Sequence, residues 1–171
     1  MRARSEMVLA DLVRIRAEAK PDLDVLTFEH ERLDGGVTPD AVRRYADLDA
    51  NGSRIAAALT RRGVGVGDRF AVMMGNHPEF VEAAVAASLL GAVFVPIDPR
   101  TRGAKLAFVL RNAGWAGLSC ADTCLPAVAA VRADVPDLRW ILALETGEEA
   151  PTPEDVDGVE SLAEILAGPV P

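Results

Sequence analysis

The sequence is poor in the residues that cross-link chains, bind metals or carry covalent chemistry. Of its 171 residues, two are cysteine, two are histidine and two are lysine. Cys120 and Cys124 are too few for a disulfide framework, and a pair four residues apart with no histidine nearby has too few ligands for a zinc site. We therefore expect two reduced thiols and no metal centre. Lysine only at Lys20 and Lys105 also leaves few candidates for a catalytic lysine.

Long hydrophobic runs are also missing. No stretch approaches the ~18 consecutive apolar residues that span a bilayer. Charged residues interrupt the first 16 positions, so the N-terminus has no apolar core of a secretory signal. These absences predict a cytoplasmic protein without a membrane span. Half of the residues are nevertheless apolar, which is enough for a buried core in a chain the length of one domain.

Positive charge is lacking where a nucleic acid would need it. The net charge of −8 comes from residues 145–171, which hold eight acidic residues and no Lys or Arg, whereas residues 1–144 hold 18 charges of each sign. A neutral body offers no basic surface to a phosphate backbone, so we expect no nucleic-acid partner. We predict an N-terminal α/β body over 1–144, followed by an acidic, proline-rich linker with one short helix over 145–171.

An alternation of helical and extended segments predicts the fold. A helix over 6–19 comes first, and then a β-hairpin whose long connection contains Asp34-Gly35-Gly36. Short strands that are apolar on both faces then alternate with helices, which predicts a parallel sheet flanked by helices. The expected strands are 25–28, 41–45, 70–74, 92–96, 117–120 and 140–144, and the later helices are 48–62, 76–90, 103–113 and 123–133.

Few side chains stand out as candidates for chemistry. The glycines of 63–67 follow a helix and open a strand, which predicts a plain connection rather than a phosphate loop. Asn76 is expected to cap the helix that follows, with Glu79 completing the cap. His30 and His77 are expected to be structural or exposed. Trp115 and Trp140 are expected in the core, and Ser119, Cys120 and Cys124 show no activating partner.

Two loops fall at the edge where parallel sheets bind ligands, beyond the carboxyl ends of the strands. One is 75–78 and the other is 97–102, which contains Asp98, Arg100 and Arg102. The second loop has the charge to meet a charged ligand. The alternative is a proline-restricted turn in which Asp98 bonds local amides and both arginines face solvent.

Several motifs occur in the order of one enzyme superfamily. Residues 90–99, LGAVFVPIDP, resemble the second core motif of the AMP-forming acyl-CoA synthetases, which also include luciferases and peptide-synthetase adenylation domains. Residues 44–48, RYADL, are similar to the first core motif, usually Thr/Ser-Tyr-x-Glu-Leu, with Arg and Asp at its first and fourth positions. Residues 67–80 and 105–113 are similar to the segments around the second motif. The pattern is closer to the acyl-CoA ligases, including the fatty-acid and carnitine-type branch, than to the adenylation domains.

The resemblance implies a fold and a reaction. The fold is part of the large N-terminal domain of such a synthetase. The reaction uses Mg²⁺ and ATP to convert a carboxylic acid to an acyl-adenylate with release of pyrophosphate, and then transfers the acyl group to the thiol of CoA. The family's Ser/Thr/Gly-rich phosphate loop, its metal-binding Thr-Glu pair, its ribose-binding Asp and its lid-domain Lys have no counterpart here. We therefore expect the N-terminal portion of a ligase. It would be inactive alone, would have no catalytic residue of its own, and would bind neither ATP, Mg²⁺ nor CoA tightly.

The resemblance also implies one candidate contact. In CoA ligases the loop after the second motif lies near the CoA entrance, which makes Asp98, Pro99 and Arg100 the candidate cofactor-binding residues, because a guanidinium matches phosphate geometry. An alternative from another class is a stand-alone, non-catalytic α/β binding module, which should have a polar outer face and an ordered end. Apolar surface left uncovered in a partial enzyme predicts a homo-oligomer.

Overall fold

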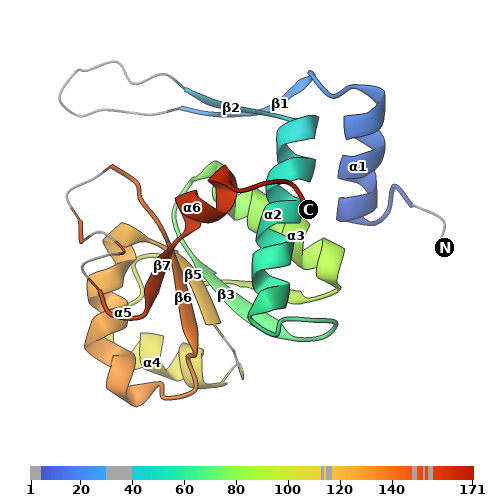
Figure 1. Ribbon diagram of the computed structural model, residues 1–171. Coiled ribbons are helices and arrows are strands. Elements are labelled where there is room, and N and C mark those ends of the chain that lie inside the picture. Colours follow the sequence, from blue (N-terminus) through green and yellow to red (C-terminus); the bar gives the residue numbers. More distant parts are fainter. Residues whose placement is uncertain are drawn as a thin grey trace.

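A five-stranded parallel sheet lies between two layers of helices, and a two-stranded antiparallel hairpin stands at one end (Figure 1). The computed structural model describes residues 5–29, 40–112, 114, 117–147, 150–151, 153 and 156–171. The helices are α1 (Leu9–Ala19), α2 (Tyr45–Arg61), α3 (Pro78–Leu90), α4 (Gly103–Asn112), α5 (Leu125–Val131) and α6 (Leu162–Ala167). The strands are β1 (Asp24–Phe28), β2 (Ala41–Arg44), β3 (Arg69–Met73), β4 (Val93–Pro96), β5 (Gly117–Ala121), β6 (Trp140–Leu144) and β7 (Val159–Ser161).

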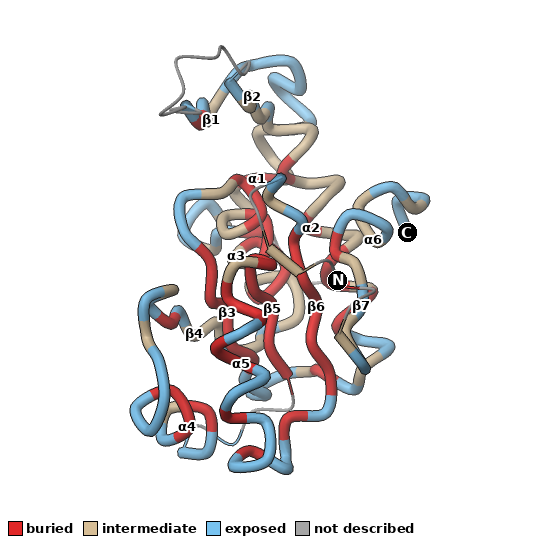
Figure 2. The backbone as a smooth tube through the Cα atoms, turned by 90° about the vertical axis from the view of Figure 1, so that its left-hand side faces the viewer, coloured by how far each residue is buried: buried red, intermediate tan, exposed pale blue. Residues whose placement is uncertain are grey.

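The sheet has the order β4-β3-β5-β6-β7, which confirms the predicted parallel α/β arrangement. Every residue of β5 and β6 is buried, and β3 is buried from Phe70 onward (Figure 2). Strands covered on both faces must be apolar at successive positions rather than at alternate ones. This explains why short apolar runs, without a period of two, marked β3, β5 and β6 correctly.

The helices form two layers, one on each face of the sheet (Figure 1). Helices α1, α2 and α3 pack against one another, α6 contacts α2, and α4 and α5 pack together on the opposite face of the sheet (Figure 1). Helices α2 and α3 approach closely at Gly52, where an added Cβ would lie 2.6 Å from Cγ1 of Val85. Only a residue without a side chain fits this crossing.

The start of α3 differs from the prediction. His77 is the N-cap residue, no side chain caps the helix, and Pro78 is its first residue. The expected cap formed by Asn76 and Glu79 is therefore wrong, because the Glu79 carboxylate accepts a hydrogen bond from Nη2 of Arg43 at 3.0 Å instead. Proline at this position needs no partner for a backbone N–H, which makes a side-chain cap less necessary.

The C-terminal segment also holds more structure than one short helix. β7 pairs in parallel with β6 and forms the fifth strand of the sheet, and α6 follows it directly. The hydroxyl of Ser161 accepts the Glu164 N–H at 3.3 Å and so caps α6. In place of the single helix expected over 123–133, the chain forms α5 with one short 3-10 turn before it and another after it. The prediction failed at β7 because three residues in a polar segment give no strand signal.

The connection at 63–67 is a plain link between α2 and β3, as predicted, with positive φ at Gly63 and Gly67. Trp140 is buried, as predicted. The expected hairpin turn at 34–36, His30 and Trp115 lie outside the described residues. No helix in the described part of the chain is both long and apolar enough to cross a membrane.

Candidate functional site

The order of the strands creates one point at the carboxyl edge of the sheet where the connections lead to opposite sides. From β3 the chain passes through α3 to β4 on one side, and then crosses back through α4 to β5 on the other. The carboxyl ends of β3 and β5 therefore form the topological switch point, where open α/β sheets bind ligands. The loop after β4 reaches this point, because Sγ of Cys124, just after β5, contacts the carbonyl oxygen of Pro99 at 3.8 Å.

The predicted candidate residues Asp98, Pro99 and Arg100 lie together in this loop. Nε and Nη2 of Arg100 donate to the two carboxylate oxygens of Asp98 at 3.0 and 2.7 Å, and the Arg100 backbone N–H donates to Oδ1 at 2.9 Å. The carbonyl of Asp98 accepts the Thr101 N–H at 2.9 Å. The loop is thus a self-bonded turn, as the alternative interpretation expected, and it presents an Arg100 side chain that is 88% exposed.

The loop carries a local excess of positive charge in a body that is neutral as a whole. Residues 98–105 contain one carboxylate, that of Asp98, and three cations, those of Arg100, Arg102 and Lys105. The Arg100 guanidinium and its backbone N–H hold the pKa of Asp98 well below its usual range, so Asp98 stays ionised at neutral pH. The guanidinium of Arg102 donates to the carbonyls of Pro99 and Thr101. An anion that reached the loop would meet an excess of positive charge.

One residue at this edge was not found from the sequence. Asp122 is buried directly after β5, and its carboxylate accepts hydrogen bonds from the Thr123 N–H at 2.8 Å, the Thr146 N–H at 2.9 Å and the Thr146 hydroxyl at 2.7 Å. It thereby ties the loop after β5 to the loop after β6. An acidic residue that follows a mostly apolar strand was the available signal.

Among the described residues there is no activated nucleophile and no group of side chains that could bind a metal ion. Cys120 and Cys124 are free and buried, and burial raises the pKa of both thiols, so they stay protonated at neutral pH. Ser119 is buried in β5. His77 lies at the N-cap of α3. Across the described ranges no three His, Cys, Asp or Glu side chains come together in a way that could hold a metal ion.

Comparison with known proteins identifies the relatives of this arrangement. The model of the family described as "AMP-binding enzyme" matches residues 13–166. The long-chain-fatty-acid–CoA ligase FadD13 of Mycobacterium tuberculosis is 33% identical over 137 residues, which are 79% of this chain and 25% of that protein. Surfactin synthase subunit 1 of Bacillus subtilis is 28% identical over 165 residues, which are 95% of this chain and 4% of that protein.

Solved structures give the same result. A structure described as a putative long-chain-fatty-acid CoA ligase from Rhodopseudomonas palustris matches with a TM-score of 0.74 and 25% identity, over 92% of this chain and 36% of that one. The chain therefore spans about a third or less of the proteins it resembles. The match covers both core motifs and nearly the whole described fold, and this chain belongs to the AMP-binding enzyme family.

Proposed function

We propose that this chain is the N-terminal portion of an ATP-dependent, AMP-forming ligase that joins a carboxylic acid, of fatty-acid or carnitine type, to CoA through an acyl-adenylate. The family match over residues 13–166 is the observation that carries this proposal. The name of the Mycobacterium tuberculosis relative, a long-chain-fatty-acid–CoA ligase, supports the fatty-acid class.

The described residues do not fit a magnesium-bound nucleotide. The glycine-rich loop 63–67 precedes β3, at the edge opposite the carboxyl ends, and no acidic cluster of the described residues suits Mg²⁺. We therefore propose that the 171 residues cannot form the acyl-adenylate alone. An ATP–pyrophosphate exchange assay with a mixture of carboxylic acids tests this. We expect no exchange above the buffer blank, and robust exchange by the 171-residue chain would contradict the proposal.

The proposed contribution of this chain is a phosphate contact for CoA. Arg100 is exposed at the carboxyl edge of the sheet and presents a planar fork of donors, and Arg102 and Lys105 add charge beside it. A phosphate that approaches Arg100 competes with Asp98 for the same guanidinium. Asp98 would hold the Arg100 guanidinium in a fixed orientation until the phosphate replaces the Asp98 carboxylate as its partner.

An NMR titration with CoA tests this contact. We expect millimolar CoA to shift the amide signals of residues 98–105, and pantetheine, which lacks phosphates, to leave them unchanged. Arg100→Ala should weaken the response about two- to fivefold, as is typical of one exposed charge pair. Arg111→Ala removes an equal charge at the other end of α4 and should have no effect. Shifts that are equal with pantetheine, or unchanged in Arg100→Ala, would remove the loop from the proposal.

The order of the C-terminal segment supports a second candidate, a stand-alone α/β binding module. β7 adds a fifth strand to the sheet, and Nε of Arg54 on α2 donates to the carbonyl of Gly168 at 2.8 Å. These contacts anchor residues 159–168 to the sheet and to α2. Exchange activity in the complete gene product would exclude this second candidate, whereas its absence there would favour it.

A further inference from the structure

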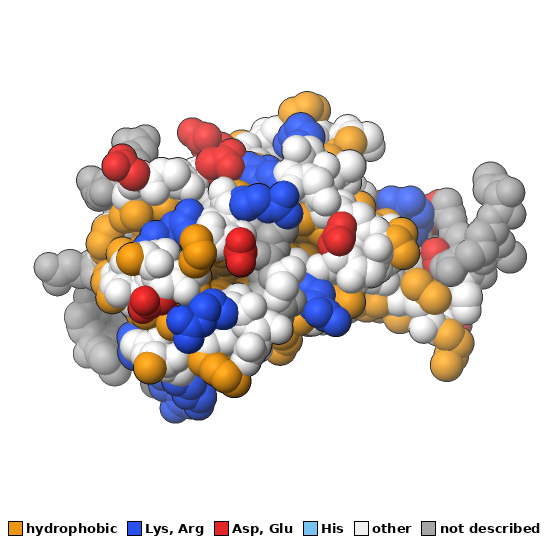
Figure 3. Space-filling view, turned by 90° about the horizontal axis from the view of Figure 1, so that it is seen from below, with side chains coloured by type: hydrophobic (Ala, Val, Ile, Leu, Met, Phe, Trp, Pro, Cys, Tyr) orange, Lys and Arg blue, Asp and Glu red, His pale blue; other side chains and the backbone are white. Residues whose placement is uncertain are grey.

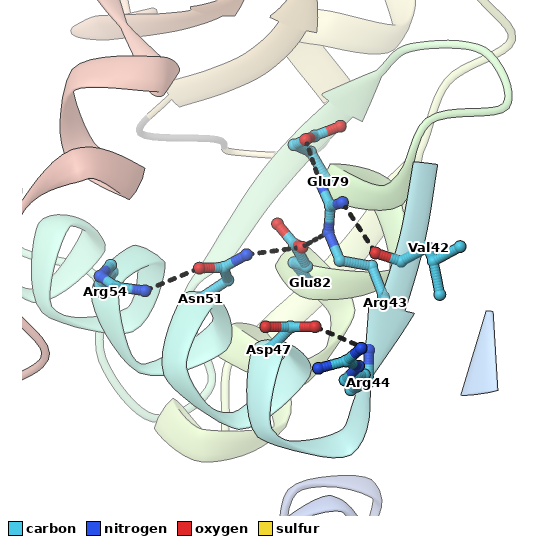
Figure 4. Close-up of polar contacts among 8 residues, drawn as sticks. All are labelled: Val42, Arg43, Arg44, Asp47, Asn51, Arg54, Glu79 and Glu82. Carbon is cyan, nitrogen blue, oxygen red and sulfur yellow. Dashed lines mark hydrogen bonds and ion pairs between the residues drawn. The ribbon is translucent and has the colours of Figure 1, made fainter. Parts of the chain in front are cut away.

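The side chain of Glu82, on α3, is fully buried and has one oxygen without a partner. Its Oε1 accepts hydrogen bonds from Nε of Arg43 at 2.7 Å and from Nδ2 of Asn51 at 2.8 Å (Figure 4). Among the described residues, its Oε2 has no hydrogen-bond partner. Buried polar atoms are nearly always paired, so the bare oxygen requires an explanation.

The charges around Glu82 do not balance if every group is ionised. Arg43 supplies the cation that contacts Glu82, and it also serves Glu79, whose Oε1 accepts Nη2 at 3.0 Å. Glu79 lies three residues before Glu82 on the same face of α3. Helix α2 adds Asn51, which is neutral, and Asp47, which is a further anion acting on Arg43. Two carboxylates therefore share one guanidinium in a buried place.

Among the residues that the structure describes, the neighbouring elements bring no second cation to Glu82. Arg54 on α2 is directed to Oδ1 of Asn51 and to the carbonyl of Gly168. On α1, Arg14 bonds Asp49, and on β2, Arg44 bonds Asp24 of β1. In the part of the chain that the structure describes, the negative charge of an ionised Glu82 would be only partly compensated.

We propose that Glu82 carries a proton on Oε2 while the β1–β2 hairpin is docked, and that loss of this proton loosens the hairpin from α3. A proton on Oε2 leaves Oε1 able to accept from both Arg43 and Asn51, and it makes the group of Arg43, Glu79 and Glu82 electrically neutral. Arg43 is the residue through which β2 contacts this group. A negative charge that forms on the buried Glu82 carboxylate therefore weakens the attachment of the hairpin to α3.

The direction of the pH dependence follows from burial. Burial raises the pKa of Glu82 above its ordinary value, against the hydrogen bonds from Asn51 and Arg43, which lower it. A carboxyl whose pKa is raised in the packed state binds its proton more tightly there than in the open state. Its contribution to docking is therefore complete below the ordinary glutamate pKa of about 4.3 and is lost as the pH rises through the raised value.

Two substitutions one turn apart separate this proposal from a plain ion pair. Glu82→Gln keeps the shape and an acceptor for Arg43 and Asn51 without a charge, so it imitates the protonated carboxyl. We expect this variant to fold and to keep its hairpin docked at all pH values. Glu79→Gln is the matched control. It removes the ionised partner of Arg43, should loosen the hairpin at every pH, and should lower the pKa of Glu82, because Arg43 then serves Glu82 alone.

Carboxyl NMR and amide hydrogen exchange of the 171-residue chain, from about pH 4 to about pH 9, give the readout. We expect Glu82 to titrate above the ordinary glutamate value. Protection of the β1 and β2 amides, corrected for intrinsic rates, should fall by up to about tenfold per pH unit up to the Glu82 pKa, the slope for one proton. This fall should be absent in Glu82→Gln. Titration of Glu82 at or below the ordinary value, or a fall that persists in Glu82→Gln, would overturn the proposal. If Glu82→Gln does not fold, the wild-type titration alone decides.

Discussion

Single residues in this protein take partners that lie far away in the sequence. Glu79 was expected to complete a local cap three residues away, but it bonds Arg43, which comes 36 residues earlier. A carboxylate gains more from a guanidinium than from a neutral backbone N–H, because the hydrogen bond is charged at both ends. Sequence spacing shows only the local partner. The signal that was available for Glu82 was a lone charge in the apolar run of α3, which requires a buried partner of unknown identity.

Gly117 carries a stability prediction at the scale of one residue. It lies directly opposite Trp140 on the neighbouring strand, and a Cβ at this position would fall 1.9 Å from Cε2 of the indole. The ring is buried, so it cannot move into solvent. Gly117→Ala should therefore destabilise the fold by about 3 kcal/mol, which is the upper range for overpacking.

Urea unfolding followed by tryptophan fluorescence measures this effect through the midpoint and the slope. Gly75→Ala is the control, because nothing lies within 4 Å of its added Cβ. It should stay within ~0.5 kcal/mol of the wild type. A Gly117→Ala variant as stable as the control would show that Trp140 is free to rotate away.

At the scale of helices and strands, the sequence predicted those elements whose bounds depend on local residue patterns. The strands with continuous apolar runs and the helices ended by Gly63 and Gly91 were found within one to three residues of their bounds. The first core motif also behaves as a helix start, since the Asp47 carboxylate accepts the Arg44 N–H at 2.8 Å. β7 was missed because its place is decided by pairing with β6 across a connection of 14 residues, 145–158. Long-range pairing leaves little trace in so short a strand.

The candidate site was predictable in place but not in detail. The rule that ligands bind beyond the carboxyl ends of parallel strands selected the 97–102 loop, and the structure brings Asp98 and Arg100 together there. The internal fork between the two was not foreseen, because it depends on the backbone turn around Pro99. Nor was the tie from Asp122 to Thr146, which joins loops whose proximity exists only in the folded sheet.

At the scale of the whole molecule, the two edges of the sheet differ in character. β7 is short and carries Glu160, which is paired with Arg62, the residue that follows α2. β4 has an exposed Val93 (41%) with Val66 (88% exposed) close by beside Gly91. Seen from below, the molecule shows apolar side chains scattered among charges of both signs (Figure 3). Short, charged edges resist pairing with another chain, whereas apolar edges favour it. The edge at β4 is therefore the expected place of self-association.

Val93→Lys tests the predicted homo-oligomer at this edge. Wild-type protein should sediment with a concentration-dependent coefficient. The effect should be stronger at about 0.5 M salt, where the repulsion between chains of net charge −8 is screened within ~4 Å. A lysine at Val93 should bring the protein close to a single monomeric species, because a buried ammonium would oppose strand pairing.

Val170→Lys makes the same charge change at an exposed position near the C-terminus and should leave the association unchanged. Equal effects of both substitutions would assign the change to net charge alone, and a wild type that is monomeric at every concentration would refute the prediction.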